Sequence, residues 1–234
     1  MGAPQLALAT RQHHAYCEAL QDAGLRVIRL APDPALPDSP FVEDAVVVIG
    51  DTAVLTHPGA PSRRGEVQAI EPEVARHFRS VRRIEAPGTL DGGDVCDCGD
   101  QVLIGVSART NETGAEQLAR VVQDAGRCPT FVDVRQLRRL LHLKSGVTYL
   151  GNRRVAVAPT LADRAELDCY EKVLLEEDEA YAANAVRVND VLLVAAGYPR
   201  FAHTLHDLGY AVVPLDVSEF RKMDGGLSCL SLRF

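Results

Sequence analysis

Residues 46–55 read VVVIGDTAVL, two apolar β-branched runs that meet at the pair Gly50-Asp51. This pattern predicts a β-hairpin, because glycine and aspartate tolerate the positive φ that a two-residue turn requires. Three more stretches follow the same pattern: VCDC-GD-QVLI around Gly99, VTYL-GN-RRVAV around Gly151 and VRV-ND-VLLV around Asn189. The chain is therefore predicted to contain four β-hairpins.

Helical periodicity fills the segments between the hairpins. Four helices are expected, over residues 10–23, 63–79, 113–126 and 198–209. The third has a capping box formed by Thr113 and Glu116, and the fourth has Pro199 at its first position. Pro72 is expected to kink or restart the second helix, because proline lacks the backbone N–H that an α-helix uses.

An Asp-x-Gly signature recurs where three of these helices end, before the apolar runs LRVIRL, CPTFVDV and YAVVPLDV. The repeating unit is therefore strand, turn, strand, helix, strand, and its copies begin near residues 45, 94, 147 and 185. The remaining N-terminal helix and strand and a C-terminal strand carrying Cys229 would form a fifth unit that is short of one strand. The sequence predicts an α/β fold of five ββαβ blades around one axial cavity, closed by the two termini.

Length, charge and cysteine usage limit the possible functions. The 234 residues fit one domain over residues 1–234, and the net charge of −7 disfavours nucleic-acid and anionic-membrane partners. We find no secretory signal and no apolar run long enough to span a bilayer, so a cytoplasmic location is expected. Cys96 and Cys98 lack the further ligands that a zinc site needs, and neither a metal nor a cofactor is expected.

Acidic residues gather just before the first two hairpins. Asp38, Glu43 and Asp44 belong to the loop DSPFVED, and Asp91 and Asp94 flank a Gly-Gly pair in LDGGD. The loop by itself reads as a solvated turn. The glycines of the second motif, however, would let the backbone approach a ligand closely. Acids at equivalent positions of two modules predict a site for a cationic group.

Four other residues complete a candidate site. Arg63 and Arg109 follow the second strands of hairpins one and two, so a matched pair could bind one carboxylate through their guanidinium forks. His142 lies amid apolar residues before hairpin three, and Cys229 follows a Gly-Gly turn near the C-terminus. Each could be an ordinary buried residue. A cysteine, a histidine and an acid brought together would form a nucleophile with its acid/base partner.

Seven segments of the chain resemble the dimethylarginine dimethylaminohydrolases of the pentein, or guanidine-modifying, superfamily. They are DSPFVEDAVVV, THPGAPSRRGE, LDGGDV, GVSARTNETGAEQL, LHLKSG, AAGYPRFAHTLHDLGY and DGGLSCLSLRF. The resemblance runs from about residue 10 to the last residue, in order and nearly without gaps. It implies a five-module pentein propeller and a hydrolase that acts on C–N bonds of linear amidines.

The resemblance also implies a role for each candidate residue. The catalytic residues would be the nucleophile Cys229, the acid/base His142 and the supporting acid Asp91. The substrate contacts would be Asp38 for the α-amino group, Glu43 and Asp44 for the guanidinium, and Arg63 and Arg109 for the α-carboxylate. The expected reaction converts asymmetric dimethylarginine or monomethylarginine to citrulline and an amine through a covalent thiouronium intermediate on cysteine.

One departure from the family keeps alternatives open. Relatives begin with an additional strand and a mobile loop that covers the substrate, and this chain starts too late to contain them, unless its true start lies upstream of Met1. Since a closing lid completes an active site, one alternative is a methylarginine-binding protein without turnover. The same cysteine, histidine and acids serve the whole superfamily, so an arginine deiminase-like enzyme or another hydrolase of substituted arginines stays open as well. The resemblance leaves a homodimer open.

Overall fold

The computed structural model describes residues 2–137 and 140–234, and the chain divides into two compact units. The first unit comprises the chain up to Ala31 together with Gly146–Leu230. The second comprises Pro32–Ser145 and the C-terminal Ser231–Phe234. The predicted single domain over residues 1–234 stays a prediction, and each unit is described by itself.

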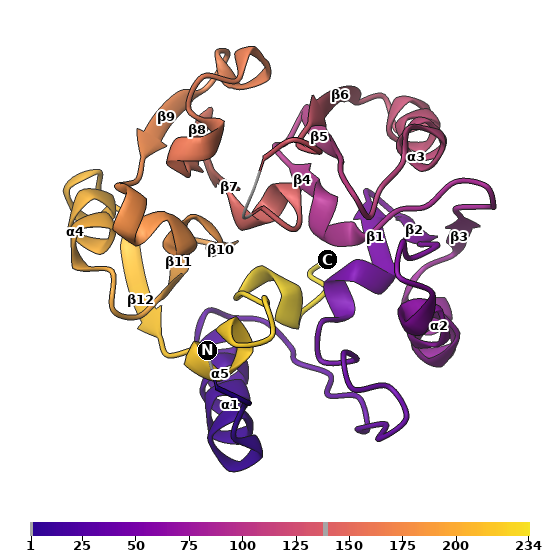
Figure 1. Ribbon diagram of the computed structural model, residues 1–234, viewed down its shortest axis with the longest axis horizontal. Coiled ribbons are helices and arrows are strands. Elements are labelled where there is room, and N and C mark those ends of the chain that lie inside the picture. Colours follow the sequence, from indigo (N-terminus) through magenta and orange to yellow (C-terminus); the bar gives the residue numbers. More distant parts are fainter. Residues whose placement is uncertain (1, 138–139) are drawn as a thin grey trace. The chain divides into compact units, whose positions relative to one another are not determined.

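The second unit begins with the hairpin of β1 (Val46–Ile49) and β2 (Thr52–Leu55), in the register Val46↔Leu55. Helix α2 (Arg64–His77) then leads to β3 (Ser80–Arg83), which pairs in parallel with β2 (Figure 1). Alternate side chains of β1 point to opposite faces, as in any strand. Val46 packs toward α2, whereas Val47 belongs to a core shared with the next sheet.

That next sheet repeats the first. It consists of β4 (Val95–Asp97), β5 (Gln101–Val106) and β6 (Cys128–Asp133), with α3 (Glu112–Asp124) connecting β5 to the parallel β6. Apolar side chains of β1, β2, β4, β5 and α3 form one continuous core in this unit. Both hairpins are therefore rigidly packed, and the turns that precede β1 and β4 have fixed positions.

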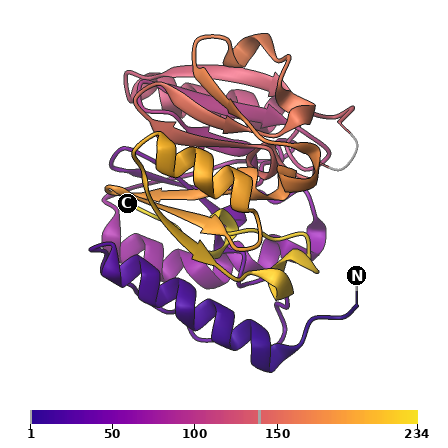
Figure 2. The same cartoon turned by 90° about the vertical axis from the view of Figure 1, so that its left-hand side faces the viewer.

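The first unit contains two more three-stranded sheets of the same topology. Their strands are β7 (Val147–Gly151), β8 (Arg154–Val157), β9 (Glu171–Leu174), β10 (Val186–Val188), β11 (Val191–Ala195) and β12 (Ala211–Leu215). Helix α4 (Pro199–Asp207) connects β11 to β12, and its Phe201 and Leu205 pack into the core of this unit. Helix α1 (Leu6–Asp22) packs against β12 and the short α5 (Ser218–Arg221) (Figure 2).

All four predicted hairpins are present, with local corrections. The N-cap of helix α3 is Asn111, two residues before the predicted cap Thr113, because the side chain of Asn111 accepts a hydrogen bond from Gly114 N at 2.8 Å. Helix α2 continues through Pro72 without a restart. The turn of the third hairpin is Asn152-Arg153, both with positive φ, rather than Gly151-Asn152.

The predicted strands of the fifth unit are not observed. Residues 25–30, LRVIRL, form no strand and pair with none among the described residues, and Ile28 is 43% exposed. Cys229 lies in a single 3₁₀ turn, Ser228–Leu230. Apolar alternation shows that a segment can form a strand, whereas a ladder also requires a neighbouring strand, and the described residues form four sheets.

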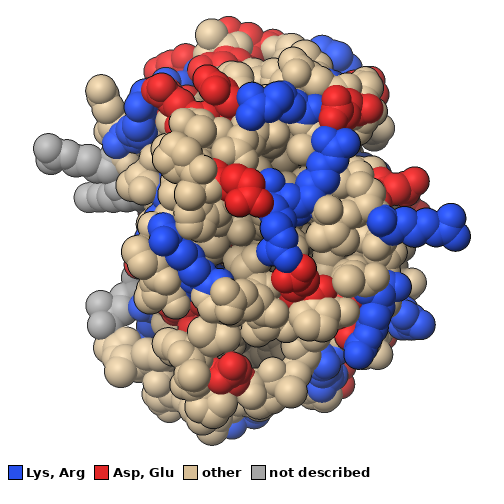
Figure 3. Space-filling model, turned by 90° about the vertical axis from the view of Figure 1, so that its right-hand side faces the viewer, with Lys and Arg blue, Asp and Glu red and all other residues tan. Residues whose placement is uncertain are grey.

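The surface carries charges of both signs. Figure 3 shows Lys and Arg atoms beside Asp and Glu atoms on one face of the molecule. Among residues 2–137 and 140–234, no helix has both the length and the apolar character needed to cross a bilayer.

Candidate active site

Two short turns of the second unit bring the predicted acids together. The 3₁₀ turn Val42–Ala45 precedes β1, and the turn Gly92–Asp94 precedes β4. A Cβ atom on Gly92 would lie 1.9 Å from the carbonyl oxygen of Glu43, so only glycine allows the two turns to approach this closely. The Gly-Gly pair of the LDGGD motif therefore allows the turn before β4 to pack directly against the turn before β1.

His142 is buried between acids from both turns. Its Nε2 donates a hydrogen bond to Asp91 Oδ2 at 3.0 Å and lies 3.9 Å from Asp44 Oδ1. Asp91 Oδ1 in turn accepts a hydrogen bond from Gly59 N at 2.9 Å. The structure thus brings together three residues that lie far apart in the sequence, and the carboxylate of Asp91 orients the imidazole ring.

The acids around His142 favour its protonated form. Burial by itself lowers the pKa of His142, but the charge of Asp44, the hydrogen bond to Asp91 and the charge of Asp94 outweigh it and raise the pKa to about 9. Burial likewise raises the pKa of Asp91, yet the hydrogen bond from His142 outweighs this and holds that pKa below its usual value. At neutral pH the pair is therefore an imidazolium beside a carboxylate.

Asp94 is a buried acid of the LDGGD motif to which the sequence interpretation assigned no individual role. It is fully buried and accepts hydrogen bonds from Ser107 Oγ at 2.6 Å, Thr110 Oγ1 at 2.7 Å and Leu143 N at 2.9 Å. Burial raises the pKa of Asp94 to about 6. Because Leu143 directly follows His142, Asp94 fixes the backbone that carries the imidazole. The sequence contained a signal for this residue, since Asp91 and Asp94 of LDGGD belong to the same short turn.

Arg63 lies in a buried ion cluster. Its guanidinium donates to Asp44 Oδ2, to both carboxylate oxygens of Glu66 and to Phe41 O at 3.0 Å. Burial opposes the charge of Arg63, but Glu66 and Asp44 raise its pKa further. The sequence interpretation missed Glu66, although its i,i+3 spacing from Arg63 at the start of α2 was visible.

Arg109 and Asp38 have a different setting from Arg63. The guanidinium of Arg109 has no hydrogen-bond partner among the described residues, and only its backbone N is bound, to Ser107 Oγ at 2.9 Å. The carboxylate of Asp38 likewise accepts no hydrogen bond from the described part of the chain, whereas its carbonyl faces Arg63 Nη2 at 3.4 Å. The two predicted carboxylate-binding arginines therefore differ in their surroundings, since Arg63 pairs with Glu66 and Asp44, and their assignment to the α-carboxylate stays a prediction.

Glu43 is buried and forms ion pairs with two cations. Its Oε1 contacts Lys144 Nζ and lies 3.4 Å from Arg233 Nη2. These contacts occupy the carboxylate that was predicted to contact a guanidinium beside Asp44. The assignment of Glu43 as a substrate ligand stays a prediction.

Cys229 belongs to the first unit and is half-buried there. The neighbouring backbone is held firmly: Ser228 N donates to Asn184 Oδ1 at 3.0 Å, and Tyr181 Oη donates to Gly225 O at 2.8 Å. A Cβ atom on Gly226 would lie 2.5 Å from Asn184 Oδ1, so glycine is required in this loop as well. The Gly-Gly turn therefore presents the thiol on a rigid loop.

One group of side chains could hold a metal ion. Oxygen and nitrogen atoms of Asp44, Asp91 and His142 lie within 4.8 Å of one another. Nε2 of His142 already donates to Asp91, and Asp44 already pairs with Arg63, so each of the three side chains has a partner of opposite charge within the protein. Cys96 and Cys98 place their sulfur atoms 3.8 Å apart, and this pair supplies two of the four ligands of a zinc site.

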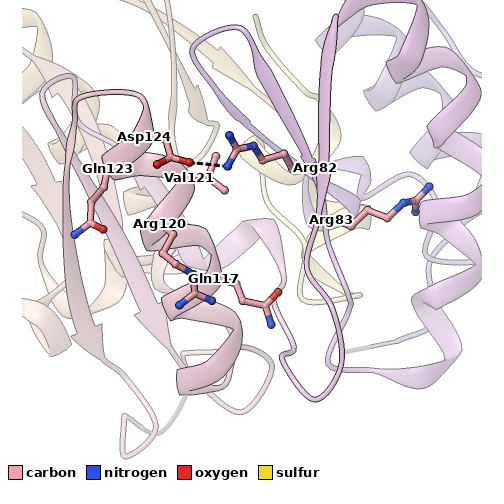
Figure 4. A pocket seen from close by; sticks show the side chains of 7 residues that line it. All are labelled: Arg82, Arg83, Gln117, Arg120, Val121, Gln123 and Asp124. Carbon is pink, nitrogen blue, oxygen red and sulfur yellow. Dashed lines mark hydrogen bonds and ion pairs between the residues drawn. The ribbon is translucent and has the colours of Figure 1, made fainter.

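A groove of about 360 Å³ lies elsewhere on the second unit, between β3 and α3 (Figure 4). Arg82 lines it and pairs with Asp124 at 2.7 Å, while Arg83 pairs with Glu71. None of the predicted site residues lines this groove. Two of its three lining arginines pair with acids of the same unit, and it is not the candidate active site.

Comparisons with known proteins agree in sequence and in structure. A family described as arginine deiminase matches residues 33–175, more than half of the 234-residue chain. The N(G),N(G)-dimethylarginine dimethylaminohydrolase of Pseudomonas aeruginosa is 43% identical, over 100% of this chain and 91% of the relative. The enzyme of the same name from Streptomyces coelicolor is 41% identical, over 97% of this chain and 86% of the relative.

Solved structures extend the likeness to the fold. The Pseudomonas aeruginosa enzyme, as a cysteine-to-serine variant complexed with citrulline, matches with a TM-score of 0.96 at 43% identity, covering 100% of this chain and 91% of that one. The N-terminal domain of a cyanobacterial arginine dihydrolase matches with a TM-score of 0.88 at 20% identity and covers 98% and 87%, which shows the fold alone. These matches confirm the predicted fold class and the resemblance on which the site residues were chosen.

Proposed function

The chain belongs to the dimethylarginine dimethylaminohydrolase family, and from this premise we infer that it hydrolyses Nω-methylated arginines to citrulline and dimethylamine or methylamine. It is a hydrolase of a guanidine C–N bond, and the reaction passes through a covalent intermediate on cysteine. The observation that carries this function is full-length similarity at 43% identity to an enzyme of that name, one variant of which was solved with citrulline.

We assign the nucleophile to Cys229. A guanidinium carbon is a poor electrophile, so a thiolate must attack it while carboxylates hold and polarise the charged group. The unperturbed pKa of a cysteine is about 8.5, and a neighbouring imidazolium favours the thiolate. The solved relatives include a cysteine-to-serine variant with citrulline and a histidine-to-glycine variant as an adduct with S-methyl-L-thiocitrulline, and both support a cysteine and a histidine in these roles.

We assign proton transfer to His142, with Asp91 as the acid that orients it. The thiolate adds to the guanidinium carbon, and the C–N bond to the methylated nitrogen breaks as His142 gives that nitrogen a proton. The amine departs, and a thiouronium group remains bound to Cys229. The neutral imidazole then takes a proton from water, whose oxygen adds to the same carbon. The C–S bond breaks while the new hydroxyl group loses its proton to solvent, which gives citrulline and the thiolate. The hydrogen bond from His142 to Asp91 supports this assignment.

Substrate contacts are proposed on the same basis. Asp44 would face the guanidinium, because its carboxylate lies 3.9 Å from the His142 ring. Arg109 and Asp38 would bind the α-carboxylate and the α-amino group, and the lack of hydrogen-bond partners for these two side chains among the described residues supports this. Arg63 was assigned to the α-carboxylate as well, and its ion cluster makes it the weaker candidate of the two arginines.

The function is tested by incubating the purified protein with asymmetric dimethylarginine, monomethylarginine and arginine and measuring citrulline. We expect citrulline from both methylated substrates and little from arginine. The Cys229→Ser variant should bind methylarginine, measured by calorimetry, and release no citrulline. A preference for unmodified arginine would instead indicate a deiminase-like enzyme. Binding without citrulline release by the wild type would indicate a methylarginine-binding protein.

A further inference from the structure

We propose that Glu43 is a positioning residue whose carboxylate ties together the two chain segments that carry the acid/base and the nucleophile. This inference rests on the proposed function, since it takes His142 and Cys229 as those two groups. Lys144 lies two residues after His142, and Arg233 lies four residues after Cys229. Both cations belong with Glu43 to the second unit.

The three side chains share one oxygen atom. Lys144 Nζ and Arg233 Nη2 both contact Oε1 of Glu43, the second at 3.4 Å. The side chain of Glu43 is 5% exposed, that of Lys144 14% and that of Arg233 25%. Ion pairs between exposed side chains contribute little to stability, whereas the loss of one partner from a buried group leaves a charge without compensation. Glu43 therefore restrains both cations.

The segment that carries His142 is anchored at the residues that follow it. Leu143 is fully buried, and its N–H donates to Asp94 Oδ1 at 2.9 Å. Ser145 N donates back to His142 O at 3.0 Å. Lys144 lies between Leu143 and Ser145 in the sequence, and its side chain pairs with Glu43. Asp94 therefore holds the backbone of this turn, and Glu43 holds the side chain of Lys144.

The segment after Cys229 is anchored at three consecutive residues. Leu232 packs against the core between β1 and α2. Arg233 contacts Glu43 with one guanidinium nitrogen, and with another it donates to Ser231 O at 3.0 Å and Ser231 Oγ at 2.7 Å. The ring of Phe234 packs edge-on against Phe78 with 4.7 Å between centroids. We name Ser231–Phe234 the C-terminal anchor.

The backbone of Glu43 is restrained as well as its side chain. Gly92 packs directly on the Glu43 carbonyl, where a Cβ atom would overlap the oxygen. Glu43 thus connects three chain segments: the LDGGD turn, the His142 turn and the C-terminal anchor. Because an error of about 1 Å between reacting groups costs on the order of 10²-fold in rate, such a connection acts on kcat. A substrate contact would act mainly on KM.

The test compares Glu43→Gln, Lys144→Met and Arg233→Met in the full chain, with citrulline release as the readout. We expect each to lower kcat by about 10- to 100-fold and to change KM by less than about 3-fold. Arg233→Lys should recover most of the activity. Because Arg233 is proposed to act through its contact with Glu43 Oε1, adding Arg233→Met to Glu43→Gln should lower kcat little further.

A second readout does not depend on turnover. The rate of Cys229 alkylation by iodoacetamide, followed against pH by mass spectrometry of its peptide, reports how far the thiolate is favoured. We expect Glu43→Gln and Arg233→Met to move the midpoint of this profile to higher pH. If the wild type released no citrulline, the proposed function would fail, whereas the alkylation profiles would still test the role of Glu43.

Lys222→Met is the matched control, because Lys222 pairs with Glu219, a similarly buried glutamate whose hydrogen bonds go to Gln5, Gln12 and Lys222 and to none of the assigned site residues. We expect it to lower the melting temperature comparably while leaving kcat and the alkylation of Cys229 unchanged. The proposal is overturned if Arg233→Met leaves both readouts at the wild-type value. It is also overturned if Glu43→Gln raises KM alone, or if Lys222→Met reduces kcat as much as Arg233→Met does.

Discussion

His142 Nε2 lies 3.0 Å from Asp91 Oδ2, and both side chains are buried. This hydrogen bond commits Nε2 to the carboxylate and leaves Nδ1 as the ring nitrogen for proton transfer. Gly93 packs close to Nδ1, because a Cβ atom added at this glycine would lie 2.8 Å from that nitrogen. The pair therefore fixes both the orientation of the imidazole and the atom that can exchange a proton with substrate.

Asp91→Asn should lower kcat/KM for methylarginines by about 10²- to 10⁴-fold, because the amide removes the charge that stabilises the imidazolium and favours a different ring tautomer. The basic limb of the pH-rate profile should also move to lower pH, since the pKa of His142 falls. Citrulline release measured between pH 6 and about 10 checks both effects. A variant with wild-type kcat and an unmoved basic limb would show that Asp91 does not act through His142.

Stability should fall as the pH rises from 6.5 through about 9. The folded-state pKa of His142 is about 9, raised from 6.5, so the stability contributed by its protonated form is complete below 6.5 and is lost as the pH passes through 9. The melting temperature of the wild type should decline across this window, and that of His142→Gln should decline less. Equal slopes for the two proteins would contradict the assignment. Asp94, with a pKa of about 6, titrates below this range.

The hairpins were predictable because their signal is local. A two-residue turn such as Gly50-Asp51 between apolar runs fixes its own geometry, and all four predicted hairpins are present. Residues 25–30 carry the same apolar signal and form no ladder among the described residues, because pairing depends on a partner that the segment itself does not encode. The start of α3 was misplaced for a related reason, since Thr113 and Asn111 compete to cap the same helix.

Composition and motif spacing also indicated the acidic motifs that surround His142, but they did not predict the ion pairs that the charged residues form. The two acidic motifs could be singled out because each precedes a hairpin, and the family resemblance then selected Asp44 and Asp91 within them. The pairing of Arg63 with Glu66, and of Glu43 with Lys144 and Arg233, is set by tertiary packing. An arginine that binds substrate and an arginine that neutralises a buried acid look alike in sequence, and only burial and contacts separate them.

Gly93→Ala should reduce kcat/KM by at least about 10²-fold, because the added methyl group would crowd Asp44 Oδ1 and the His142 ring, each 2.8 Å away. Gly65→Ala is the control, since its Cβ would meet only the side-chain tip of Leu36 at 3.2 Å and alanine favours the helix there. We expect the control to keep its activity and melting temperature. Wild-type citrulline release by Gly93→Ala would mean that the ring and Asp44 do not need their present spacing.

Arg109 and Arg63 should respond to substitution in opposite ways. Arg109 has no guanidinium partner among the described residues, so Arg109→Met should raise KM for methylarginine by about 10- to 100-fold through the loss of a bidentate carboxylate contact, with the melting temperature unchanged. Arg63 is bound by Asp44 and Glu66, so Arg63→Met leaves two buried acids unpaired and should cost on the order of 3–5 kcal/mol in unfolding free energy. Steady-state kinetics and urea denaturation of both variants check the contrast. A stable Arg63→Met protein with a raised KM would instead place Arg63 on the substrate carboxylate.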